Sequence, residues 1–292
     1  MNIFSISLDD SKYSKQHPQE DALKHTDNSF AIADGITRDP IGNLDFSKFT
    51  MQDLAKTYPN PSPAKVAADK FVETFIEVLN NQTDNSIESV RKAFKQSNLE
   101  IEKLNKTHNP NPDYLDNDYW ACVACGGVIK NNILYWGSID DCKVKVFDKD
   151  FKIKLDSPNN HEVFEQYFHY SGHTPQGFDW NKPEWRKHVR KEFRNNLKQV
   201  IDEKLVSFGA LTGEESALNF ISYGTIELEK GDYVLFYSDG FEDLVNSAEF
   251  KDLIDSVRTT RNIELLKSKS LELGLSDWRK FGRERSLILI TI

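Results

Sequence analysis

The sequence is poor in cysteine and has no long apolar run. Its 292 residues include three cysteines, an odd and low number that argues against a disulfide framework and is typical of a reducing cytoplasm. No stretch approaches the 18 apolar residues of a membrane-spanning helix, and the first ten residues alternate like a strand instead of resembling a signal peptide. We therefore expect a cytoplasmic protein that does not associate with membranes.

The chain also has fewer basic residues than acidic ones. The chain has 46 acidic residues against 37 lysines and arginines, for a net charge of -9. This disfavours nucleic acid or an anionic membrane as the main partner, because both require a positive surface. No repeat or low-complexity linker divides the sequence, so we expect a single domain over residues 1–292. A polar, aromatic segment at about 158–205 is interpreted as an insertion or flap within it.

The cysteine and histidine pairs of this sequence give little support for a zinc site. Cys122 and Cys125 have CxxC spacing, but no second pair follows, so we interpret them as buried thiols. His161, His169 and His173 lie in a segment without cysteine, and of these only His169 and His173 are four residues apart. We interpret them as part of a loop or flap surface.

Hydrophobic periodicity predicts both helices and strands, and hence an α+β layered fold. Residues 1–36 are expected to form two strands joined by a polar loop. Apolar spacing predicts helices over 63–80, 86–105, about 183–204 and about 247–272. Further strands are predicted over 120–129, 133–137, 143–147, 226–228, 233–237 and 287–292. Hairpin-type spacing between many of the strands favours antiparallel sheets.

Two apolar strands end in the same dipeptide. Residues 30–33 lead directly into Asp34-Gly35, and residues 233–237 lead, after Ser238, into Asp239-Gly240. A single Asp-Gly pair would favour a simple turn. Two copies with further acids nearby favour a site instead, because an acid at the end of a buried strand has a rigid support and glycine permits close backbone approach.

The further acids are Glu20 and Asp21, before the strand that leads to Asp34, and Glu284, before the last strand. In antiparallel pairing the start of one strand lies beside the end of its neighbour, so these residues and Asp239 are expected to meet at one sheet edge. Clustered carboxylates repel one another unless cations are bound. An all-oxygen ligand set suits magnesium or manganese, and paired ions about 3.5–4 Å apart are a known device for hydrolysing phosphate esters.

At these residues the chain resembles the PP2C-like (PPM-type) metal-dependent serine/threonine protein phosphatases. The resemblance spans nearly the whole sequence and preserves the order of the motifs. The third motif usually reads Gly-Asp-Ser in the family, and the last usually has Asp before its strand. The matching segments here are Glu20-Asp21-Ala22, Ala33-Asp34-Gly35, Gly137-Ser138-Ile139-Asp140-Asp141, Gly231-Asp232-Tyr233 through Ser238-Asp239-Gly240, and Glu284-Arg285-Ser286.

The resemblance implies a fold and a set of metal ligands. The fold would be a four-layer α/β/β/α sandwich of two antiparallel sheets flanked by helices. Asp34 would bridge two Mn²⁺ or Mg²⁺ ions, and Asp34 and Asp239 would be essential for catalysis. Asp140 stands where bacterial relatives hold a third ion. The full set of implied metal-binding residues is Glu20, Asp21, Asp34, Gly35, Asp140, Asp239 and Glu284.

The resemblance also implies an activity. Water made acidic by the two ions would attack a phosphoserine or phosphothreonine ester in line at phosphorus, and the ions would neutralise the phosphoryl oxygens. The partners would be a phosphorylated protein substrate and, in a signalling role, a cognate serine/threonine kinase.

Several departures from the family pattern leave two alternatives open. Ile36 follows Asp34-Gly35 where many relatives have a histidine acid or methionine, and Gln16 stands where many eukaryotic relatives have a phosphate-binding arginine. Lys12, Lys15 and Arg38 are the candidates to replace that arginine. The first alternative is a catalytically weak or inactive phosphatase relative that serves as a binding or regulatory module. The second is an unrelated acidic metal-binding hydrolase.

Overall fold

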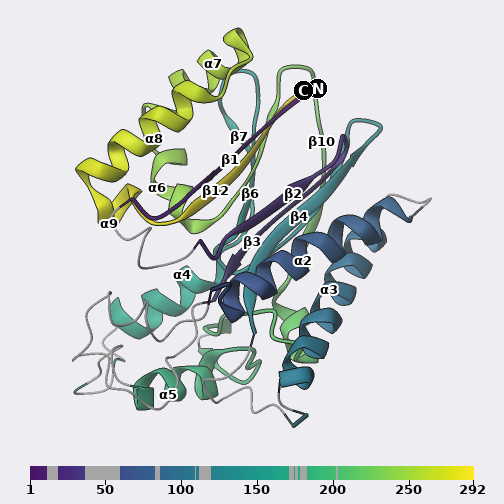
Figure 1. Ribbon diagram of the computed structural model, residues 1–292, viewed down its shortest axis with the longest axis vertical. Coiled ribbons are helices and arrows are strands. Elements are labelled where there is room, and N and C mark those ends of the chain that lie inside the picture. The colour runs from purple at the N-terminus through teal and green to yellow at the C-terminus, as the bar shows by residue number, and fades with distance from the viewer. Residues whose placement is uncertain are drawn as a thin grey trace.

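Two five-stranded antiparallel sheets form the centre of the protein in a computed structural model of the chain (Figure 1). Helices cover the outer face of each sheet, which gives the α/β/β/α layers that the sequence predicts. The structure describes residues 1–11, 19–36, 60–82, 86–108, 110–111, 120–170, 174, 177, 183–201 and 203–292.

The first sheet joins the two ends of the described chain. Its pairing at one edge aligns Asn2 with Thr291 and Leu8 with Arg285, so the first and last strands run side by side and the two termini lie together (Figure 1). In spatial order its strands are β1 (Asn2–Leu8), β12 (Arg285–Thr291), β11 (Tyr233–Tyr237), β6 (Lys143–Phe147) and β7 (Ile153–Asp156).

The second sheet contains the strand that ends in the first Asp-Gly pair. In spatial order its strands are β10 (Ser222–Glu227), β5 (Ile133–Ile139), β4 (Cys122–Lys130), β3 (Ser29–Gly35) and β2 (Ala22–His25). Asn131 and Asn132 both have positive φ and form the tight turn predicted between β4 and β5. The prediction of two strands before residue 36 was wrong, because a short polar turn at 26–28 divides the second into β2 and β3.

Alternating side chains on the strands separate the two cores. On β12, Ile288 and Ile290 point into the core between the sheets, whereas Leu287 and Leu289 point to the helices outside. This is the period of two expected for a strand buried on both faces. Because the strands are covered on both sides, their ends are held rigidly, and the candidate site lies at these ends.

Two long helices cover the second sheet. They are α2 (Pro63–Asn80) and α3 (Ile87–His108), and Phe71, Phe75 and Phe94 pack between them and the strands. Ser62 caps α2 by accepting a 3.0 Å hydrogen bond from the backbone N–H of Lys65, as expected for a serine before a first-turn proline.

Shorter helices cover the first sheet. They are α6 (Glu242–Val245), α7 (Phe250–Thr260), α8 (Glu264–Ser276) and α9 (Trp278–Phe281). The prediction of one helix over 247–272 was wrong, because Arg261 adopts a left-handed conformation and ends α7 there. None of the helices in the described ranges combines the length and apolar composition needed to cross a bilayer.

The segment at about 158–205 builds a small core of its own. It contains α4 (Asn160–Glu165), the π-helical turn η2 (Gln166–Tyr170), α5 (Pro183–Phe193) and the short strands β8 (Val200–Ile201) and β9 (Lys204–Leu205). Phe164, Phe168, Val189, Phe193 and Val206 pack together within it. Its interpretation as a flap stays a prediction.

The predicted helix over 183–204 ends early, at Phe193. Asn195 has a φ of 52°, and its side-chain amide donates a 3.0 Å hydrogen bond to the carbonyl of Ala210. The left-handed backbone ends the helical path, and the amide ties the chain to the neighbouring segment instead.

Candidate metal centre

Acids from opposite ends of the sequence meet at one end of the two sheets. The pairing of Ala22 with Ala33 places Asp21 beside Asp34, one residue further along. One carboxylate oxygen from each of Asp21, Asp34 and Glu284 lies within 4.8 Å of the others. Asp34, Asp239 and Glu284 also line a common cavity of about 390 Å³. The predicted convergence of strand-end acids is therefore present in the fold.

The glycine of each Asp-Gly pair stands where another segment comes too close for a side chain. A β-carbon on Gly35 would lie 2.6 Å from the carbonyl carbon and oxygen of Ala64, at the start of α2. A β-carbon on Gly240 would lie 2.2 Å from the carbonyl oxygen of Glu284. The glycines let a helix start and the chain before β12 pack against the acidic turns.

Ser238 connects Asp21 to the last strand. Its hydroxyl donates a 2.6 Å hydrogen bond to Oδ2 of Asp21 and accepts a 2.9 Å hydrogen bond from the backbone N–H of Ser286. The other carboxylate oxygen of Asp21, Oδ1, is buried and has no hydrogen-bond partner among the described residues. A buried carboxylate oxygen without a donor is a position that a cation would satisfy.

Glu20 is held differently from the other acids. Its carboxylate accepts a short hydrogen bond from the hydroxyl of Ser62, while its backbone N–H donates a 2.6 Å hydrogen bond to Oε2 of Glu284. Glu20 therefore positions Glu284 and the start of α2. Its role near an ion stays a prediction, as does the role of the Gly35 carbonyl, although Gly35 lines the cavity.

The acids are costly to ionise without a cation. Burial is the main cause, and neighbouring carboxylates add to it. Together they raise the pKa of Asp21 to about 7 and of Glu284 to about 9, and hold the pKa of Asp34 well above its usual value. Because the donors are carboxylate oxygens, the cluster fits Mg²⁺ or Mn²⁺.

A second group of possible ligands lies in the turn after β5. Asp140, which is expected to hold a third ion, has a φ of 61°, the conformation that favours glycine. One ligand atom each of Asp140, Asp141 and His161 lies within 4.8 Å of the others. Burial is the main cause of the raised pKa of Asp34, and the Asp141 carboxylate adds to it. The role of Asp140 at an ion stays a prediction.

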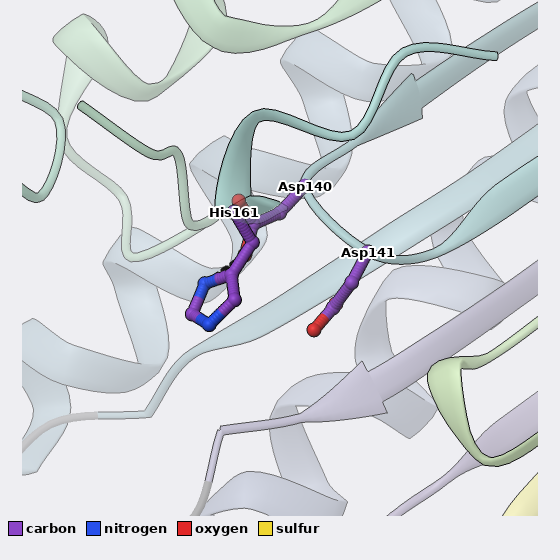
Figure 2. A group of neighbouring side chains, drawn as sticks. All are labelled: Asp140, Asp141 and His161. Atoms are coloured by element: carbon purple, nitrogen blue, oxygen red, sulfur yellow. Dashed lines mark ion pairs between the residues drawn. The ribbon is translucent and has the colours of Figure 1, made fainter. Parts of the chain in front are cut away.

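His161, which is expected on a loop or flap surface, lies in α4 and lines the cavity. Its Nδ1 lies 3.3 Å from Oδ2 of Asp140 and its Nε2 lies 3.5 Å from Oε1 of Glu165. Figure 2 shows the imidazole ring and the Asp141 side chain pointing to the same side, with Asp140 behind the ring. Burial alone would lower the pKa of His161, but its contacts to Asp140 and Glu165 outweigh burial and raise the pKa to about 11. His161 is therefore a cation that ties α4 to the turn.

Two arginines near the last strand have different roles. Arg285, which follows Glu284, is 1% exposed and donates to the Ser270 hydroxyl and the Arg283 carbonyl. It stabilises the packing of α8 and is not among the residues that line the cavity. Arg283 does line the cavity, and its Nη1 lies 2.6 Å from Oδ2 of Asp239. No sequence motif pointed to Arg283.

The structure describes some of the residues that depart from the family pattern and not others. Ile36 lines the cavity, so the wall beside Asp34-Gly35 offers an alkyl group at the position of the family histidine. The alternative phosphate-binding residues Lys12, Lys15 and Arg38 lie outside the described residues, and their roles stay predictions.

The fold was compared with known proteins. The chain matches no protein-family model and no curated protein sequence. Solved structures, in contrast, match it over nearly its whole length, with probability 1.00. This is the fold of the PP2C-type phosphatases.

Three structures with the PP2C-type fold illustrate the likeness. The catalytic domain of the serine/threonine protein phosphatase PstP, in complex with two manganese ions, has a TM-score of 0.59 at 15% identity, covering 99% of this chain and 96% of that one. The Mycobacterium tuberculosis serine/threonine phosphatase PstP/Ppp has a TM-score of 0.57 at 17% identity, with the same coverage of both chains. The S. agalactiae serine/threonine phosphatase has a TM-score of 0.58 at 14% identity, covering 100% of this chain and 99% of that one.

Proposed function

We propose that this protein is a metal-dependent serine/threonine protein phosphatase. The observation that carries the proposal is the convergence of Asp21, Asp34 and Glu284, whose oxygens lie within 4.8 Å of one another at the strand ends of a PP2C-type fold. The PstP structure with two manganese ions supports the same choice of metal. The substrate would be a phosphorylated protein, with a cognate kinase as the opposing enzyme.

Some residues of the chain would hold ions, and others would shape the cavity. Asp34, Asp239 and Glu284 would hold two Mn²⁺ or Mg²⁺ ions, and Asp21 would complete the set through its unpartnered Oδ1. When bound, these ions supply a water of lowered pKa and neutralise phosphoryl charge. Ile36 excludes water and offers no proton, so the leaving serine or threonine oxygen must take its proton from another group.

The test is a phosphatase assay with metal titration. We expect turnover of p-nitrophenyl phosphate and of phosphoserine peptides to require added Mn²⁺ or Mg²⁺ and to disappear with EDTA, because the acid cluster has no other means of activating water. Metal content measured on the same samples serves as the control. Full activity in metal-free buffer would contradict the proposal.

A second candidate function is a binding module that keeps the fold without efficient turnover. Ile36 favours it, since a positioned proton donor is typically worth about 100- to 10,000-fold in rate, and this wall of the cavity has none. A protein that binds Mn²⁺ and phosphopeptides but does not release phosphate would support this candidate over the first.

The two acids of the turn after β5 lead to a prediction about a third ion. Asp141→Asn should weaken Mn²⁺ binding by at least about tenfold, because Asp141 adds charge to the cluster. Asp140→Gly should leave Mn²⁺ affinity nearly unchanged, since glycine suits the φ of 61° at that position and the Asp140 carboxylate faces His161. Binding isotherms of both variants decide the assignment, and a weaker isotherm for Asp140→Gly would return the role to Asp140.

A further inference from the structure

Arg283 extends from the chain before β12 over the acid cluster. Its side chain is 59% exposed, and its Nη1 contacts Oδ2 of Asp239 at 2.6 Å. Among the described residues that line the cavity, it is the only arginine or lysine. Its guanidinium is thus at the mouth of the site, with one face on the acids and the other open to solvent.

The guanidinium has more donors than this contact uses. Arginine presents five N–H groups in a planar fork that matches the oxygens of a phosphate, and the contact to Asp239 engages one of its terminal nitrogens. His161 also lines the cavity, but both its ring nitrogens face carboxylates. Arg283 has further N–H groups beyond its contact to Asp239 that can donate to a ligand.

Cations bound to the acids would change what Arg283 faces. The carboxylates that now attract it would be neutralised, and a positive side chain beside positive ions is unfavourable unless an anion lies between them. A phosphoryl group held at the ions is such an anion. The fork can keep one N–H on Asp239 and direct the others to phosphoryl oxygens, as paired N–H donors of arginine commonly do.

We propose that Arg283 binds the phosphoryl group of the substrate. It thereby replaces the phosphate-binding arginine that many eukaryotic relatives have at the position of Gln16. The inference deepens the proposed function and rests on it for the nature of the ligand. It assigns a substrate-contacting role to the residue that directly precedes Glu284, a proposed metal ligand, in the sequence.

The experiment measures phosphate binding separately from turnover. With saturating Mg²⁺, the dissociation constant for inorganic phosphate is measured by ³¹P NMR line broadening, and KM and kcat are measured with p-nitrophenyl phosphate. Arg283→Ala should weaken phosphate binding and raise KM by about 10- to 100-fold, the loss typical of hydrogen bonds between charged groups. Arg283→Lys should fall between the parent and Ala, because it keeps the charge and loses the fork.

Arg279→Ala is the matched control, since Arg279 is an exposed arginine on α9 that does not line the cavity. It should leave both constants unchanged. Unchanged phosphate binding in Arg283→Ala at saturating Mg²⁺ would overturn the proposal and leave Arg283 as a partner of Asp239 alone. If the parent binds phosphate without turning over any ester, the proposed function fails, while the binding constants still decide the role of Arg283.

Discussion

Replacing Asp34 by asparagine is expected to reduce turnover by at least about 100- to 1000-fold, the range seen when a main electrostatic contact of an active site is removed. Asp34 lies at the centre of the cluster, where the carboxylates of Asp21, Asp239 and Glu284 all raise its pKa. Asparagine has the same shape but cannot balance the charge of two cations. Mn²⁺ affinity should therefore fall together with the rate.

The same replacement should not unfold the protein. In the metal-free state burial, and after it the neighbouring carboxylates, keep the pKa of Asp34 well above the usual value, so a neutral amide at this position removes an unfavourable buried charge. The melting temperature of Asp34→Asn in EDTA should equal or exceed that of the parent. Asp27→Asn, at an exposed position in the turn between β2 and β3, is the control. Near-normal rates for Asp34→Asn at saturating Mn²⁺ would remove Asp34 from the centre.

The second large effect is a fall in the stability of the metal-free protein as pH rises from 6 to 9. The pKa values of Asp21, Asp141 and Glu284 are raised to about 7, 8 and 9, mainly by burial, whereas in the unfolded chain such groups titrate near 4. Over this window the folded state holds more protons than the unfolded state, so the free energy of unfolding falls as the pH rises. The slope is about 1.4 kcal/mol per pH unit for each group that is still protonated in the folded state, and the contribution of a group ends above its folded-state pKa.

Bound metal should reverse this trend. Cations replace the protons on the carboxylates, so Mn²⁺ affinity should increase with pH. Melting temperatures at pH 6, 7, 8 and 9, in EDTA and in saturating Mn²⁺, test both parts. We expect a decline of several degrees in EDTA and a flat or rising curve in Mn²⁺. Parallel curves would show that the acids are not the metal site.

The strand-end acids could be predicted because their placement follows from local rules. An apolar strand ending in an acid puts that acid at a sheet edge, and antiparallel pairing brings the start of the next strand beside it. Asp34 and Asp239 satisfy the first condition, and Asp21 and Glu284 satisfy the second. The helix over 63–80 was likewise predictable from Ser62-Pro63 and its apolar spacing, and its bounds are confirmed.

The residues that sequence reasoning missed depend on details that no local pattern contains. Asp140 and Asp141 are both acids in one turn and both line the cavity, and the left-handed φ of Asp140 does not follow from the residue type. Arg283 and Arg285 differ in that Arg285 pairs with Leu8 inside β12, whereas Arg283 precedes the strand. His161 reaches the cavity through the packing of α4, which is a tertiary property. In a strand, a register error of one residue moves a side chain to the opposite face of the sheet.

The position of Ser238 between Asp21 and Ser286 has a consequence for how the chain holds together. Its hydroxyl links residues from the beginning and the end of the sequence, and the acids beside it come from the same two regions. An ion bound there would act as a non-covalent crosslink that closes almost the whole chain into a ring. Closing a long loop restricts the unfolded chain strongly, so the metal would slow the separation of β1 from β12 even though it contacts neither strand along its length.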